Sequence, residues 1–292
     1  MLRSQRFRPI QYEFPFFCLL RLTIFTLLLP LAVGAQSHAA GAGGESHEGE
    51  APFIKTSRVT ITNPAEFQKA GVLQLEYGYD AYYRARNFRM EQASPLTLRF
   101  AATDRLLLAL DFVTFISERH HEHDPRETSV GDTRLGFQVV ALKETPERPA
   151  LSFAYYVKLP TGSEEKELST GRVDHRFVVL TGKKFGETSV DFNAALLRVG
   201  RSHESGWTNG GQAALAISRS VGRGFGVVGE LAGQTRKDVQ PSGLYALGLV
   251  NYHVSHRLSL DAGMRFGLNP EAPPVGIVFG MTVGLFDFYK KH

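Results

Sequence analysis

Apolar and polar residues alternate along most of the chain after residue 70. Within 151–159, for example, Leu151, Phe153 and Tyr155 fall on one face, while Ser152 and Ala154 fall on the other. A period of two is typical of a strand with one apolar face. The pattern predicts twelve strands, which lie near 73–80, 96–100, 106–112, 132–139, 151–159, 177–181, 189–196, 211–219, 226–234, 243–252, 258–266 and 275–285.

The connections between these stretches indicate where the apolar faces lie. After the first connection, long segments such as 116–130 and 160–174 alternate with short ones such as 102–105 and 254–257. Outer-membrane barrels have long external loops and short periplasmic turns, whereas a soluble meander has no reason to sort its connections in this way. A secreted soluble β-protein is the alternative, because alternation alone does not distinguish a lipid-facing surface from a core.

A lipid environment would also require the predicted sheet to close into a barrel. No segment after residue 35 contains 18 consecutive apolar residues, which excludes helical membrane spans. In hydrocarbon, each unpaired N–H or C=O group at a strand edge costs several kcal/mol. The expected fold class is therefore all-β: a closed antiparallel up-and-down transmembrane β-barrel of about 12 strands.

The first 35 residues have the features of a cleaved secretory signal. Four arginines, three of them within the first eight residues, accompany the apolar run 22–33, and Val33-Gly34-Ala35 supplies small residues for cleavage. A membrane anchor is the alternative, but the run is shorter than the roughly 20 residues that span a bilayer. The predicted organisation is a signal peptide (1–35), a flexible periplasmic N-terminal segment (36–70) and an outer-membrane barrel (71–289). A plug or a tether is the alternative for 36–70.

Charge and cysteine content exclude several classes of protein. The 292-residue chain has a net charge of +4, but removing the signal removes four Arg and one Glu. The remainder has 29 basic and 28 acidic residues, a charge of +1, so the sequence offers no electrostatic support for nucleic-acid binding. The single cysteine, Cys18, lies in the signal, and one cysteine builds neither an internal disulfide nor a thiolate zinc site.

Several short motifs resemble those of a known family. They are Gly71-Val72-Leu73-Gln74-Leu75-Glu76, Val130-Gly131-Asp132 with Leu135-Gly136, and Val157-Lys158-Leu159-Pro160-Thr161-Gly162. The sequence resembles the phenol-degradation meta-pathway (MetA-like) outer-membrane proteins, which are labelled transporters. The resemblance implies a barrel, passage of small compounds with aromatic ones as candidates, and contact with outer-membrane lipid and the barrel-assembly machinery. It carries no catalytic residues and no cofactor. Such barrels usually end on an aromatic residue, whereas this chain continues past Tyr289.

The alternation also assigns charged side chains to the lumen. The predicted lumen-lining residues are Glu76, Arg99, Asp111, Asp132, Arg134, Lys158, Asp191, Glu230, Asp261 and Arg265, with Arg176 as a weaker candidate. Charges inside a barrel must be solvated or paired. They either tune the selectivity of a polar pore or form an internal ion-pair network that rigidifies a narrow barrel. The near balance of signs argues against a strong preference for anions or cations.

Other motifs offer weaker evidence for chemistry. His120, His121 and His123 lie in a predicted external loop, and imidazole suits Zn, Cu or Ni, although a solvated polar loop is the favoured interpretation. Gly224–Gly229 matches a dinucleotide-binding spacing, but a strand follows it where that motif needs a helix. His175 and Ser218 lie in predicted strands without a triad context, so we expect no enzyme.

These patterns predict a bacterial outer-membrane channel. We expect passive passage of small solutes, with hydrophobic or aromatic compounds as candidate cargo. The alternative is a non-conducting outer-membrane barrel whose external loops bind a partner or a metal ion.

Overall fold

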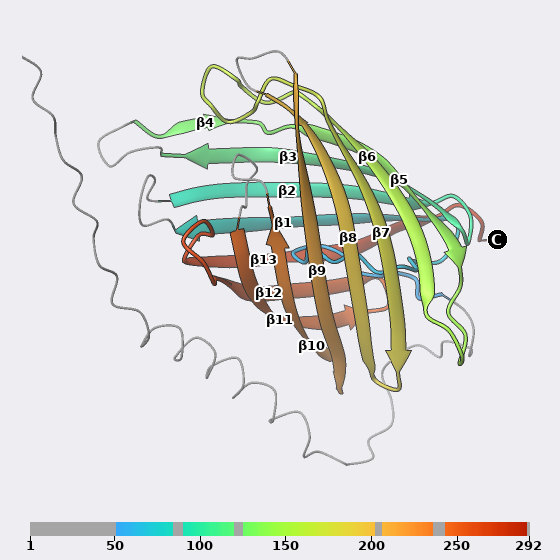
Figure 1. The fold of residues 1–292 in the computed structure, drawn as a ribbon. Coiled ribbons are helices and arrows are strands. Elements are labelled where there is room, and N and C mark those ends of the chain that lie inside the picture. The colour runs from blue at the N-terminus through green and yellow to red at the C-terminus, as the bar shows by residue number, and fades with distance from the viewer. Residues whose placement is uncertain (1–50, 84–89, 120–124, 202–205, 236–242, 291–292) are drawn as a thin grey trace, which may run out of the picture. The chain divides into compact units, whose positions relative to one another are not determined.

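The computed structural model describes residues 51–83, 90–119, 125–201, 206–235 and 243–290. Its regular elements are strands (Figure 1), and in this part of the chain no helix has the length and apolar character needed to cross a membrane. The strands are β1 (Val72–Tyr83), β2 (Met90–Ala101), β3 (Leu106–Glu118), β4 (Glu127–Ser129), β5 (Thr133–Leu142), β6 (Ala150–Leu159), β7 (Asp174–Phe185), β8 (Thr188–Gly200), β9 (Trp207–Gly222), β10 (Phe225–Gln234), β11 (Gly243–Ser255), β12 (Leu258–Gly267) and β13 (Val275–Asp287).

The strands form one closed antiparallel sheet. Each long strand pairs with the next along the chain, and β1 pairs with both β2 and β13. The closing register runs from Val72 opposite Asp287 to Tyr83 opposite Val275. β4 and β5 both pair with β3 and act as one strand interrupted at 130–132, so the barrel has twelve strands. The predicted fold class and all twelve predicted stretches are confirmed.

The connections at one end of the barrel are shorter on average than those at the other. One end, called the turn end here, carries the connections 102–105, 143–149, 186–187, 223–224 and 256–257. The other end, called the loop end, carries 84–89, 119–132, 160–173, 201–206, 235–242 and 268–274, with β4 inside the second of these. In outer-membrane barrels short turns lie on the periplasmic side, so we assign the turn end to the periplasm.

The two faces of the sheet differ as the alternation predicts. Large apolar side chains such as Leu196 (71% exposed) and Phe177 (53% exposed) lie on the outside of the barrel. Polar side chains including Gln74, Glu76 and Glu230 are buried on the inside. An apolar exterior with a polar interior is the reverse of a soluble fold and suits contact with lipid.

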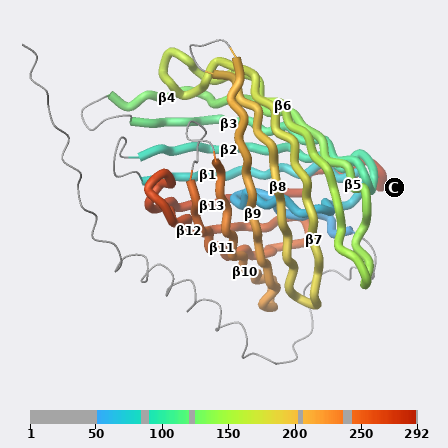
Figure 2. Tube along the Cα trace, viewed as in Figure 1, coloured from blue at the N-terminus to red at the C-terminus, as the bar shows by residue number. Residues whose placement is uncertain are grey.

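The described residues before β1 lie inside the barrel rather than beside it. Residues 53–68 form a loop that enters from the turn end, and the backbone N–H of Lys69 donates to the carbonyl of Pro52 at 2.9 Å where the loop closes. In Figure 2 this blue trace runs among the barrel strands. We call residues 51–70 the plug segment. Side chains of the inner wall form hydrogen bonds with backbone groups of Thr62, Asn63 and Ala65, which places this part of the segment 36–70, expected to be flexible, inside the barrel. Residues 1–50, which include the predicted signal, lie outside the described residues.

A charge on the outer face at mid-height tests the lipid-facing assignment. Leu215 lies near the middle of β9, and Val221 lies on the same face near the turn end. We expect Leu215→Arg to lower the free energy of unfolding in lipid vesicles by about 2–4 kcal/mol, and Val221→Arg by about 0–1 kcal/mol, because the cost depends on depth in the bilayer. Urea titration of the heat-modifiable gel shift measures both. An equal loss for the two variants would contradict a transmembrane barrel.

Candidate functional site

Arg58 fixes the plug segment to the barrel wall. Its guanidinium forms ion pairs with Asp80 of β1 at 3.1 Å and with Asp261 of β12 at 2.8 Å. The side chain of Arg58 is only 6% exposed. A buried guanidinium held between two carboxylates is costly to remove, because both acids would be left without their cation.

A pair of glycines makes room for Arg58. Gly78 of β1 and Gly280 of β13 lie opposite each other in the closing register. A Cβ atom at either position would overlap the guanidinium of Arg58. Only glycine therefore allows the side chain to lie flat against the wall at this point.

Side chains of the wall satisfy the backbone of the plug segment. Glu230 accepts hydrogen bonds from the N–H groups of Ile61 at 3.1 Å and Thr62 at 2.8 Å. Asn193 accepts from the N–H of Asn63 at 2.7 Å and donates to its carbonyl at 2.9 Å. Irregular backbone at membrane depth persists only where such partners exist. These wall residues therefore serve as fixed anchors for an irregular segment.

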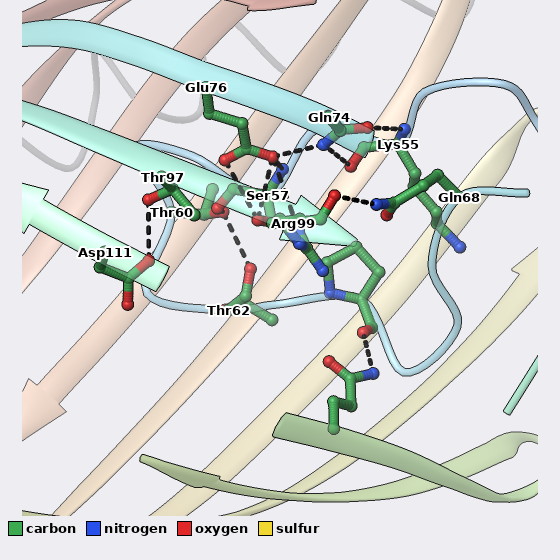
Figure 3. A network of polar contacts seen from close by, with 12 residues as sticks. Lys55, Ser57, Thr60, Thr62, Gln68, Gln74, Glu76, Thr97, Arg99 and Asp111 are labelled. Atoms are coloured by element: carbon green, nitrogen blue, oxygen red, sulfur yellow. Dashed lines mark hydrogen bonds and ion pairs between the residues drawn. The ribbon is translucent and has the colours of Figure 1, made fainter. Parts of the chain in front are cut away.

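A second group of anchors lies toward the turn end (Figure 3). Gln74 accepts from the N–H of Lys55 at 2.9 Å, and Glu76 accepts from the N–H of Ser57 at 3.1 Å. Arg99 lies 3.5 Å from Glu76 and completes this network. Burial lowers the pKa of Lys55, and the nearby carboxylate of Asp191 opposes that shift.

A cavity of about 540 Å³ lies between the plug segment and the loop end. Plug residues from Ser57 to Ile61 form one side of it, and inner-wall residues form the rest. The loop 160–173 folds toward the cavity, because Asp132 accepts hydrogen bonds from the N–H of Gly162 at 3.0 Å and from the hydroxyl of Ser169 at 2.7 Å. This volume is within the range of small-molecule sites.

Ion pairs neutralise much of the cavity wall. Arg134 donates from Nε to Asp111 at 2.6 Å. Lys158 lies between Asp132 at 2.8 Å and Asp174 at 2.9 Å. These pairs link β3 with β5 and β6 with β7, so they brace the wall as well as line it.

All ten residues predicted for the lumen lie on the inner side of the barrel. Seven of them take part in ion pairs, namely Glu76, Arg99, Asp111, Asp132, Arg134, Lys158 and Asp261. Glu230 binds the plug backbone, and Asp191 accepts a hydrogen bond from the backbone of Ala65. Arg265 donates to the hydroxyl of Tyr82 and to the carbonyl of Val59 at 2.7 Å. Whether these residues also tune selectivity stays a prediction.

The sequence analysis missed three residues that take part in this network. Asp80 and Asp174 share the inward parity of Glu76 and Arg176, so the alternation itself could have identified them. Arg58 lies outside any alternating stretch, and no local signal marks it.

The weaker candidates have other surroundings. Among the residues described by the structure, no group of three or more His, Cys, Asp and Glu could hold a metal ion. His120, His121 and His123 lie outside those residues, so the metal prediction is not tested. His175 pairs with the hydroxyl of Tyr155 at 2.7 Å on the outer face.

A closed twelve-stranded barrel with an apolar exterior and a polar lumen defines an outer-membrane β-barrel protein. The chain belongs to the family described as "Putative MetA-pathway of phenol degradation", whose model matches residues 56–281. That match confirms the resemblance drawn from the short motifs. No curated protein matches the sequence.

Solved structures of other barrels share the fold. The chain is similar to the COG4313 outer membrane channel from Pseudomonas putida F1, with 16% identity, a TM-score of 0.62, and coverage of 77% of this chain and 100% of that one. A KdgM porin has 10% identity, a TM-score of 0.47, and coverage of 73% and 99%. Outer membrane phospholipase A from Escherichia coli has 13% identity, a TM-score of 0.43, and coverage of 75% and 94%. The first likeness supports the fold, and the last two support no further argument.

Removing the central anchor tests how the plug segment is held. We expect Arg58→Met to lower the free energy of unfolding by about 3–5 kcal/mol, because it leaves Asp80 and Asp261 without their cation. Hydrogen exchange of residues 51–70 should accelerate in the same variant. The control is Lys143→Met, which breaks an exposed pair with Asp104 at the turn end and should change neither quantity. Unchanged exchange in Arg58→Met would contradict the anchoring role.

Proposed function

We propose that the protein is a passive channel for small solutes, with hydrophobic or aromatic compounds as candidate cargo. The observation that carries the proposal is the cavity of about 540 Å³ inside a closed barrel, one side of which is a segment held mainly by side-chain hydrogen bonds and ion pairs. Family membership and the channel named among the structural neighbours favour transport over a purely structural barrel.

The plug segment suggests how passage is restricted. It fills the turn-end half of the lumen, and it is held by polar contacts, which water can replace, as well as by apolar packing such as that of Phe67 against Leu107 and Val140. A solute that enters the cavity from the loop end meets this segment before it can reach the turn end. Small displacements of the segment would therefore control the rate of passage.

Planar-bilayer recording tests whether the barrel conducts. We expect the refolded protein to give stable single-channel steps, and Arg134→Gln to change their size, because it removes a charge from the cavity wall and frees Asp111. Arg198→Gln is the matched control, since Arg198 lies on the outer face over the ring of Trp207. Electrical silence across solutes and voltages would overturn the channel and favour the barrel whose loops bind a partner.

A reversible cross-link tests whether the plug segment limits passage. Because the chain has no cysteine after Cys18, a cysteine pair at Asn63 and Asn193 would be unique in the processed protein. These two residues exchange two hydrogen bonds. We expect oxidation of the double variant to lower conductance and reduction to restore it, while the two single variants show no redox response. A redox-insensitive conductance in a fully cross-linked double variant would show that this segment does not limit passage.

A further inference from the structure

Two lumen arginines differ from the other lumen cations. The carboxylates around the cavity are paired with Arg58, Arg99, Arg134 and Lys158. In the described ranges, no ion pair involves Arg176 or Arg265. Among the described charged residues that line the cavity, pairing therefore leaves these two guanidinium groups without a carboxylate partner.

Neither guanidinium has its full set of acceptors. Arg265 is 6% exposed and donates to Tyr82 and to the plug carbonyl of Val59, but its Nε has no acceptor. Arg176 lies 6.0 Å from the ring of Tyr156, and its buried Nε also has no acceptor. A buried donor without an acceptor is unfavourable, and the cost is larger for a charged group.

Both arginines line the same cavity. Its lining includes buried apolar residues as well, among them Leu168 of loop 160–173 and Leu197 of β8. A guanidinium binds a carboxylate through two parallel hydrogen bonds, which a neutral hydroxyl or a cation cannot form. The apolar wall would receive an organic body, which a simple inorganic ion lacks.

We propose that Arg176 and Arg265 form a binding site for a small organic carboxylate in the lumen. The site recognises its ligand through two guanidinium groups that have no carboxylate partner in the described chain rather than through net charge, since acids and bases in the lumen nearly balance. It refines the expectation that the near balance of signs argues against a strong preference for anions or cations. The inference deepens the proposed function by giving the chemical class of the solute. That such a carboxylate is also transported rests on the channel proposal.

Three small ligands that share a benzene ring and differ in charge test the site. Isothermal titration calorimetry of the full chain in detergent at pH 7.5 and low salt would compare benzoate, benzyl alcohol and benzylammonium. We expect benzoate to bind at least tenfold more tightly than benzyl alcohol, and benzylammonium to bind most weakly. Equal affinities for benzoate and benzyl alcohol would overturn the proposal without any variant.

Substitution locates the site. Arg176→Gln should weaken benzoate binding by at least fivefold, Arg176→Lys should have an intermediate effect, and the outward-facing control Arg198→Gln should leave it unchanged. The heat-modifiable gel shift verifies that each variant is folded. If Arg176→Gln does not fold, Arg176→Lys carries the comparison. Equal benzoate affinity in the wild type and in the folded Arg176 variant would overturn the assignment.

The same protein separates this inference from the channel proposal. A barrel that binds benzoate but is electrically silent would refute the channel and keep the carboxylate site. A barrel that conducts but binds benzoate no better than benzyl alcohol would refute the site and keep the channel.

Discussion

Hydrogen bonding between β1 and β13 is the contact on which the rest of the structure depends. These strands are the first and last of the sheet, and their pairing removes the only two edges it would otherwise have. In hydrocarbon those edges would leave many unsatisfied groups. Closure also divides the side chains, so that residues such as Leu196 and Phe177 face lipid while Glu76 and Glu230 are enclosed. The lumen is thus a product of the closure.

The enclosed polar residues have two uses along the barrel axis. Toward the turn end they hold an irregular segment, as when Glu230 accepts two backbone N–H groups and Asp261 receives Arg58. Toward the loop end they line a cavity in which most charges are paired. A polar cavity and an ion-pair network therefore occupy the same barrel. Among the described charged residues that line the cavity, the ion pairs leave Arg176 and Arg265 without a carboxylate partner.

The sequence predicted the barrel well because a strand repeats every two residues and each face meets one environment. That periodicity placed Arg99 and Asp261 on the inner face without any knowledge of their partners. It could not place the plug segment, which has no period and whose Arg58 contacts Asp261, 203 positions away. It also missed β4 (Glu127–Ser129), which lies inside the predicted connection 116–130. The alternation along a strand predicts whether a side chain faces the lumen or the lipid. Which charged residues pair with each other depends on their neighbours across the lumen.

The space that Gly78 and Gly280 leave for Arg58 has a consequence for the order of folding. The two glycines come from β1 and β13, strands at opposite ends of the barrel sequence, so this space exists only after the sheet has closed. Contacts between such distant segments carry the largest loop-closure entropy and form late. The guanidinium of Arg58 therefore reaches its final position only once the last strand has joined the first. Docking of residues 51–70 thus reports the completion of folding.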